Sequence, residues 1–139
     1  MRHEYGHFID FELPSETKQF SMGKFKKAYF SDLDVMIANR ETKNMKWYAD
    51  RYKGVPEMQG VSDIVDAMSG GLFRDRHRMW GHGQTYYRRE SMRMTETFAN
   101  TFEAWSVQGE AWAEIQTQFP NIASTFDEIM EGILNENIS

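Results

Sequence analysis

The motif H-E-x-x-H at residues 3–7 places the strongest constraint on what this chain can fold into. On a helix, this spacing puts the imidazoles of His3 and His7 one turn apart on the same face, where a zinc ion fits between them. The carboxylate of Glu4 then lies beside a zinc-bound water. The motif therefore requires a helix, which we expect over residues 1–13, and it indicates a zinc-dependent, peptidase-type site.

The rest of the chain is also mostly helical in its periodicity. Apolar residues recur at three- and four-residue steps between Glu16 and Tyr52, with a weak point at residues 39–44, and this predicts two or three helices. Further helices, each with an apolar stripe and bounded by Gly, Pro or cap residues, are expected over Asp63–Ser69, Thr95–Val107, Ala111–Phe119 and Pro120–Leu134. A chain of 139 residues suffices for one compact domain. We therefore predict a mainly α, multi-helix single domain over residues 1–139.

Residues 72–93 are the exception, because they show neither a helical nor a strand period. The segment is rich in Gly, Arg and aromatic residues. Phe73, Met79 and Trp80 make part of it a candidate for a short strand or hairpin. A loop this long inside a compact domain is usually functional or disordered, and the aromatic residues argue against disorder.

Composition and charge exclude several classes of protein. The chain has no cysteine, which rules out a disulfide scaffold and a cysteine zinc site. The net charge of −5 argues against nucleic acid as a partner, although residues 74–93 contain six arginines, most simply explained as a solvated, arginine-rich loop. No apolar run approaches membrane-spanning length and no signal-peptide core is present, so neither a membrane nor an export pathway is expected.

A catalytic zinc of this class needs a third protein ligand. The next histidine after the motif is His77, which excludes a third histidine a few residues downstream. Glu96, in the sequence E-T-F-A-N, is the candidate, with Glu103 as a competitor on the same helical face. Asn100, one turn after Glu96, could hydrogen-bond a ligating imidazole from behind. The alternative is that Glu96 is an ordinary acid in a first helical turn, favoured by the helix dipole.

Hydrolysis of a peptide also requires a donor that stabilises the oxyanion. His82, Tyr86 and Tyr87 lie just before the Glu96 helix, and an imidazole or a phenol can donate that hydrogen bond. The alternative is that both tyrosines are packing residues and that His82 is a surface turn residue. As a cluster between two metal-ligand elements, the three favour a catalytic role.

These motifs, H-E-x-x-H, then G-H-G-x-x-Y-Y at residues 81–87, then E-T-F-A-N at residues 96–100, resemble the glutamate-type zincins. More narrowly, they are similar to metallopeptidase-like domains of phage minor head (head morphogenesis) proteins and to the anthrax lethal-factor type of domain. The resemblance covers residues 3–107, as a zincin-like core, and leaves 108–139 as additional C-terminal helices. It implies a phage or prophage origin, and a location in the bacterial cytoplasm or in the virion.

The resemblance also implies roles for individual residues. Zinc would be bound by His3, His7 and Glu96, and Glu4 would be the general base. His82 and Tyr86 or Tyr87 would contact the substrate or the oxyanion. The expected substrate is a peptide or protein, and phage structural proteins are further expected partners.

One departure from the family pattern points to a second hypothesis. Such domains usually have a strand and a helix before the metal helix, and here only two residues precede His3. We therefore expect a chain truncated at its N-terminus, in which a frayed first turn would weaken zinc binding by His3. The alternative function is a catalytically inactive helical module for phage structure or assembly that retains the motif.

Overall fold

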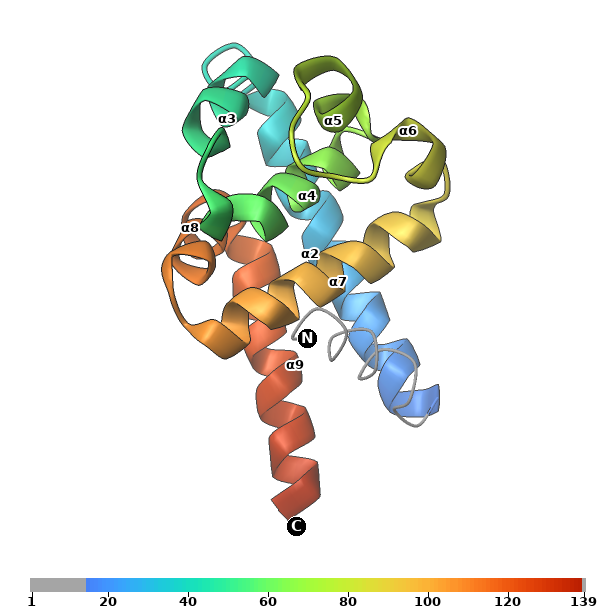
Figure 1. The fold of residues 1–139 in the computed structure, drawn as a ribbon. Helices are drawn as coiled ribbons and strands as arrows, with labels where there is room; N and C mark the ends of the chain where they lie inside the picture. The colour runs from blue at the N-terminus through green and yellow to red at the C-terminus, as the bar shows by residue number, and fades with distance from the viewer. Residues whose placement is uncertain (1–14, 139) are drawn as a thin grey trace.

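The computed structural model describes the backbone of residues 15–138 and the side chains of residues 22–135. This part of the chain is built from helices, with no strand in it (Figure 1). The elements are α2 (Ser15–Ala38), α3 (Met45–Tyr52), the 3-10 turn η1 (Pro56–Met58), α4 (Gln59–Met68), α5 (Leu72–His77), α6 (Gly83–Tyr86), α7 (Glu90–Val107), α8 (Glu110–Gln118) and α9 (Pro120–Ile138). The prediction of a mainly α single domain is confirmed. The helix predicted over residues 1–13 lies outside the described residues.

The break predicted at residues 39–44 separates α2 from α3. Asn44 caps α3, because its side-chain oxygen accepts a hydrogen bond from the backbone N–H of Trp47 at 2.9 Å. The stretch from Glu16 to Tyr52 therefore forms two helices, as its periodicity predicts.

The boundaries predicted for the next helix are wrong. The helix α4 begins at Gln59 rather than at Asp63, and every residue from 61 to 68 is buried. Ser62, which precedes the predicted start and would cap a helix beginning at Asp63, lies inside α4 instead, where its hydroxyl donates a hydrogen bond to the backbone oxygen of Trp80 at 2.8 Å. The first turn was missed because Gln59 is exposed and Gly60 is a poor helix former, so neither an apolar pattern nor helix propensity indicates it.

The short hairpin considered for residues 72–93 is also wrong. This segment contains the two short helices α5 and α6 and the first turn of α7. At its start, Gly71 has a φ of 94°, and a Cβ at this position would collide with the backbone of Gly83 and Gln84. This close approach folds α6 back against the start of α5, which leaves no room for paired strands.

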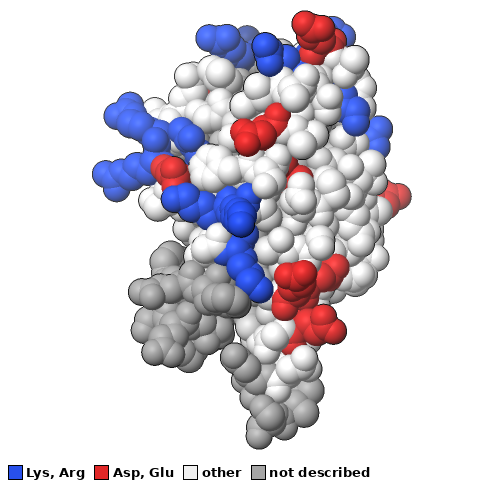
Figure 2. Space-filling model, turned by 180° about the vertical axis from the view of Figure 1, so that it is seen from behind, with Lys and Arg blue, Asp and Glu red and all other residues white. Residues whose placement is uncertain are grey.

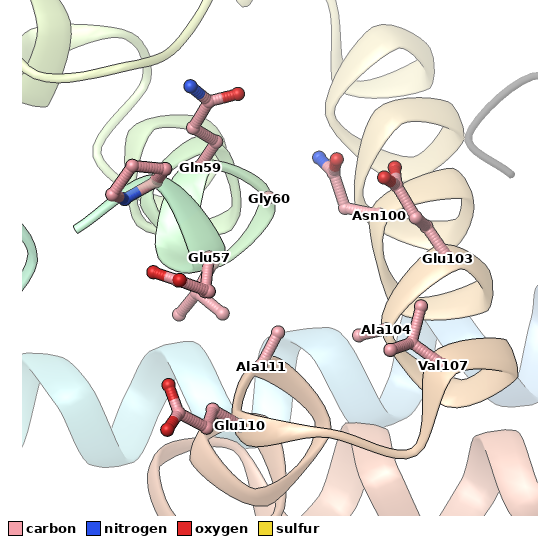
Figure 3. A pocket seen from close by; sticks show the side chains of 11 residues that line it. Glu57, Gln59, Gly60, Asn100, Glu103, Ala104, Val107, Glu110 and Ala111 are labelled. Carbon is pink, nitrogen blue, oxygen red and sulfur yellow. The ribbon is translucent and has the colours of Figure 1, made fainter. Parts of the chain in front are cut away.

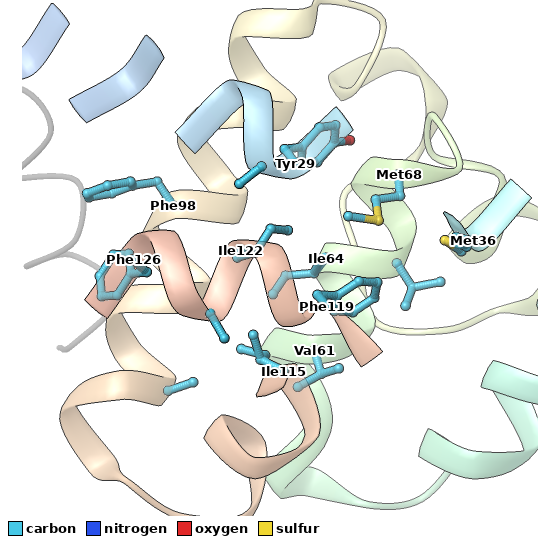
Figure 4. Packing of buried hydrophobic residues seen from close by; sticks show 14 of the residues in the cluster. Tyr29, Met36, Val61, Ile64, Met68, Phe98, Ile115, Phe119, Ile122 and Phe126 are labelled. Carbon is cyan, nitrogen blue, oxygen red and sulfur yellow. The ribbon is translucent and has the colours of Figure 1, made fainter. Parts of the chain in front are cut away.

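The hydrophobic core lies where α4 packs against α7 and α9 packs against α2 and α8 (Figure 4). Phe98 of α7 is central, with its ring edge-on to Phe25 of α2 at 5.2 Å and to Phe126 of α9 at 5.3 Å between centroids. Full burial of one such ring stabilises the fold by roughly 1.5–3 kcal/mol. The core therefore fixes α7, which carries two of the site residues described below.

Two buried acids connect helices at the edges of the bundle. Asp32 of α2 caps α9, because its carboxylate accepts hydrogen bonds from the backbone N–H groups of Asn121 and Ile122. Glu114 of α8 binds Arg51 through two side-chain hydrogen bonds and accepts a third from Tyr52, both residues lying in α3. These contacts join helices that are distant in sequence.

Charge is unevenly distributed over the surface. Five arginines of the 72–93 segment are exposed, namely Arg74, Arg76, Arg78, Arg88 and Arg89. Seen from behind, many Lys and Arg side chains gather on the left of the molecule and a group of Asp and Glu side chains lies to their lower right, with further charges of both signs at the top and on the right (Figure 2). A search of the described helices finds none with the length and apolar character needed to cross a membrane.

Candidate active site

Three elements meet at the polar end of the core: α4, the segment Gly81–Tyr87 and α7. The helix α4 contributes Asp63 and Asp66, and α7 contributes Glu96 and Asn100. Their exposed fractions are 6%, 0%, 4% and 5%, respectively. Burial of a carboxylate is costly unless it is hydrogen-bonded, so three acids at one place require an organised set of donors.

Asp66 holds the turn that presents His82. Its Oδ2 accepts hydrogen bonds from the backbone N–H groups of His82 at 2.8 Å and Gly83 at 2.9 Å, and its Oδ1 accepts one from Arg74 at 2.9 Å. The turn wraps so closely around this carboxylate that a Cβ at Gly81 would collide with Oδ2. Gly83 has a φ of 84°, a conformation that side chains disfavour. The two glycines beside His82 therefore follow from the shape of the turn.

Asp63 orients the imidazole of His82. Its Oδ1 lies 3.0 Å from His82 Nδ1 and accepts a hydrogen bond of 2.6 Å from the hydroxyl of Tyr87. Its Oδ2 accepts a hydrogen bond of 2.8 Å from the side-chain amide of Asn100. Because a carboxylate can only accept, Nδ1 carries the proton, and Nε2 is the ring atom left to act on a ligand.

Glu96 lies on the other side of His82. Its Oε2 is 3.9 Å from His82 Nε2, and its Oε1 accepts a hydrogen bond of 2.7 Å from the hydroxyl of Tyr86. The ring of Tyr86 stacks on the imidazole with a centroid distance of 4.3 Å. One tyrosine thus positions both the carboxylate and the imidazole.

The charges of the site shift the pKa values of its donors. The hydrogen bond to Asp63 and the nearby carboxylates raise the pKa of His82, against partial burial, which lowers it. Burial and the hydrogen bond to Glu96 raise the pKa of Tyr86, while burial and the charge of Asp63 raise that of Tyr87. Both phenols are therefore protonated donors at neutral pH, and His82 is protonated to a larger extent than a free histidine.

The donor atoms of this cluster suit a divalent metal. One ligand atom from each of Asp63, His82 and Glu96 lies within 4.8 Å of the others. Carboxylate oxygen and imidazole nitrogen are both zinc donors, with bonds of about 2.0–2.2 Å. The pairing of Asp63 with Nδ1 of His82 is the kind of contact that orients an imidazole at a metal site. The residues present therefore fit a metal bound at Glu96, with His82 beside it.

The structure brings together five residues singled out from the sequence: His82, Tyr86, Tyr87, Glu96 and Asn100. Two details differ from expectation. Glu96 lies in the second turn of α7, which begins at Glu90, so the helix dipole does not account for it. Asn100 donates to Asp63, which in turn bonds to His82, instead of reaching an imidazole directly.

The remaining residues considered for the site are His3, Glu4, His7 and Glu103. The motif residues His3, Glu4 and His7 are outside the described residues, and the proposed ligand set therefore stays a prediction. Glu103 lines a cavity further along α7 and is not part of the acidic cluster around His82.

Asp63 and Asp66 were missed in the sequence. They occur three residues apart in V-S-D-I-V-D-A-M, where the apolar neighbours indicate a buried helix. Two acids one turn apart in such a helix are the signal that could have identified them, because carboxylates are rarely fully buried unless they are paired.

A cavity of about 370 Å³ adjoins this site (Figure 3). It lies between η1, the start of α4, α7 and α8, and Asn100 forms part of its wall. Since Asn100 also bonds to Asp63, the cavity and the acidic cluster are separated by a single side chain.

Comparison of the chain with family models, with curated proteins and with solved structures found no match.

Proposed function

We propose that this chain is a zinc-dependent peptide hydrolase domain of the glutamate-zincin type. The observation that carries the proposal is the environment of Glu96. This carboxylate is 4% exposed, accepts a hydrogen bond from Tyr86 and has His82 Nε2 at 3.9 Å. A carboxylate that could bind a metal, an imidazole and a phenol at one place are groups that can serve metal-assisted hydrolysis.

In this proposal, His3, His7 and Glu96 hold the metal. Tyr86 keeps the Glu96 carboxylate in one orientation, because its hydroxyl occupies Oε1. Oε2, on the side of His82, would then be the oxygen offered to the ion. Zinc would supply a water of lowered pKa and would polarise the substrate carbonyl.

The remaining residues handle protons and charge. Glu4 would serve as the general base that accepts a proton from water. His82, whose pKa is raised by Asp63, would present a protonated Nε2 able to donate a hydrogen bond to the substrate carbonyl oxygen. Asp63 and Tyr87 hold the imidazole in this orientation and do not contact the substrate.

Metal analysis of the purified, dialysed protein tests the proposal. We expect one zinc per chain, lost in His7→Ala and Glu96→Ala and retained in Glu4→Ala, which should fail to cleave peptides. Absence of stoichiometric zinc from the wild-type chain would refute the proposal and favour the inactive structural or assembly module.

The variant His82→Ala separates two arrangements of the site. If His82 acts on the oxyanion, zinc is retained and kcat falls by about 10²–10³-fold, as for loss of an oxyanion donor. If zinc is lost instead, His82 is itself a ligand together with Glu96. Asp63 would then either be a third ligand or orient the imidazole of His82 through its hydrogen bond. His77→Ala, on α5, is the matched control and should affect neither quantity.

A further inference from the structure

We propose that the cavity between η1, α7 and α8 binds a lysine or arginine side chain of a peptide substrate. This inference rests on the proposed peptidase function, because it assigns the cavity as a substrate pocket beside the Glu96 centre. The cavity begins at Asn100, one helical turn from Glu96 along α7 (Figure 3). A peptide bound across Glu96 would therefore place a nearby side chain at its mouth.

The walls of the cavity match the stem of a long side chain. Its volume of about 370 Å³ lies in the range of ligand pockets. The apolar part of the wall comes from Pro56, Val61, Ala104, Val107 and Ala111. Lysine and arginine place their methylene stems along such surfaces while their charged ends reach polar groups.

The charge of the cavity selects the end group. Glu57, Glu103 and Glu110 line it, and no Lys or Arg is among the described residues that line it. Within the described part of the chain, Glu57 and Glu110 form no ion pair. Negative charges around a cavity with apolar walls focus a negative electrostatic potential inside it, and this potential attracts a cation.

Asn100 adds a neutral acceptor at the end of the cavity nearest Glu96. Its side chain is 5% exposed, and its amide nitrogen is directed to Asp63. The Oδ1 atom lies toward Gly60, another lining residue, at 3.4 Å from the position that a Cβ would occupy there. No hydrogen bond from a described residue reaches this oxygen, which leaves it able to accept one from an ammonium or guanidinium group.

A peptide-binding experiment with the Glu4→Gln variant of the 139-residue chain, loaded with zinc, tests the inference without turnover. Fluorescently labelled ten-residue peptides carry a single lysine at each position in turn, each paired with a norleucine peptide of the same length. We expect at least one position at which lysine binds about three- to tenfold more tightly than norleucine, as for two or three weak, solvent-accessible charge contacts. This preference should decrease as salt is raised.

Paired variants locate the effect. Glu57→Gln combined with Glu110→Gln keeps the shape of the cavity and should reduce the lysine preference to less than about twofold. Glu41→Gln combined with Glu131→Gln changes the net charge equally at exposed positions outside the cavity and should leave the preference intact. Ala111→Leu, which fills part of the cavity, should weaken lysine binding even though it retains all the glutamates.

Equal affinity for lysine and norleucine at every position would overturn the inference, and so would a preference that persists in the Glu57 and Glu110 double variant. Cleavage of an unrelated protein substrate and zinc content are measured separately on the wild-type chain. Cleavage without a lysine preference refutes the cavity assignment alone. A lysine preference without zinc or cleavage supports the cation pocket and refutes the proposed hydrolase.

Discussion

Replacement of Asp66 by asparagine should be among the most destabilising polar substitutions in this protein. The carboxylate is fully buried and accepts three backbone hydrogen bonds, from Arg74, His82 and Gly83. Asparagine has a single acceptor oxygen. In its best orientation it keeps the two bonds made by Oδ2 and directs its NH₂ group against the N–H of Arg74.

The magnitude follows from the lost bonds. A hydrogen bond to a charged group contributes about 1.5–3 kcal/mol, and a buried donor left without a partner costs about 1–3 kcal/mol. The neutral amide recovers part of the cost of burying a charge. We therefore expect Asp66→Asn to lower the free energy of unfolding by about 2–4 kcal/mol, out of the roughly 5–15 kcal/mol typical of a domain.

Urea denaturation followed by circular dichroism measures this loss, with the slope m unchanged if the native state keeps its compactness. The matched control is Asp75→Asn, because Asp75 also accepts hydrogen bonds from a backbone and a side-chain nitrogen, both of Gln84, but is exposed. Its substitution should cost less than about 1 kcal/mol. In Asp66→Asn, the amide of Arg74, which loses its acceptor, should also exchange with solvent faster than in wild type. A stability within about 0.5 kcal/mol of wild type would refute the assignment of Asp66 as the support of the turn.

Three further predictions concern the scaffold. Asp32→Ala removes the cap of α9 and leaves the buried N–H of Ile122 unpaired, so it should lower the free energy of unfolding measured in urea by about 2–3 kcal/mol. Asp34→Ala, at an exposed position of the same helix, is the control and should leave this free energy nearly unchanged. Burial raises the pKa of Glu114, but the hydrogen bonds from Arg51 and Tyr52 outweigh it and hold this pKa below its ordinary value of 4.5. The resulting stabilisation is present above pH 4.5 and is lost as pH falls through the folded-state pKa. The urea midpoint should therefore decline less steeply on acidification in Glu114→Gln than in wild type. Gly81→Ala should lower the free energy of unfolding by about 1–3 kcal/mol, because its Cβ collides with Asp66. Gly132→Ala, in α9 with open space around it, should raise the free energy of unfolding by about 0.5–1 kcal/mol and increase the thermal midpoint. Equal effects of the two substitutions would contradict the packing described for the turn.

Much of the scaffold could be predicted from local patterns. The helices α8 and α9 and the break between α2 and α3 follow from apolar spacing and from Asn44, Gly109 and Pro120, whose effects act within one or two turns. The first turn of α4 and the helices of residues 72–93 could not be predicted in this way. They are held by distant contacts, such as that of Ser62 with Trp80, which override weak local preferences.

The same distinction applies to the site. Glu96, His82 and the tyrosine pair could be singled out because they occur in short, unusual patterns. Asp63 and Asp66 resemble ordinary helix acids in the sequence. Their function depends on distant partners: His82 lies 16 residues after Asp66, and Asn100 lies 37 residues after Asp63. Such partners are brought together only when α4 packs against α7.

The sequence by itself determined that this chain is helical and that acidic, imidazole and phenol groups occur in an order suited to metal chemistry. Only the tertiary structure decided that Tyr86 bonds to Glu96 while its neighbour Tyr87 bonds to Asp63. The reason is geometric, because consecutive residues of a single helical turn point about 100° apart. The placement of residues 86 and 87 within reach of both α7 and α4, and not any local preference, determines which carboxylate each hydroxyl meets.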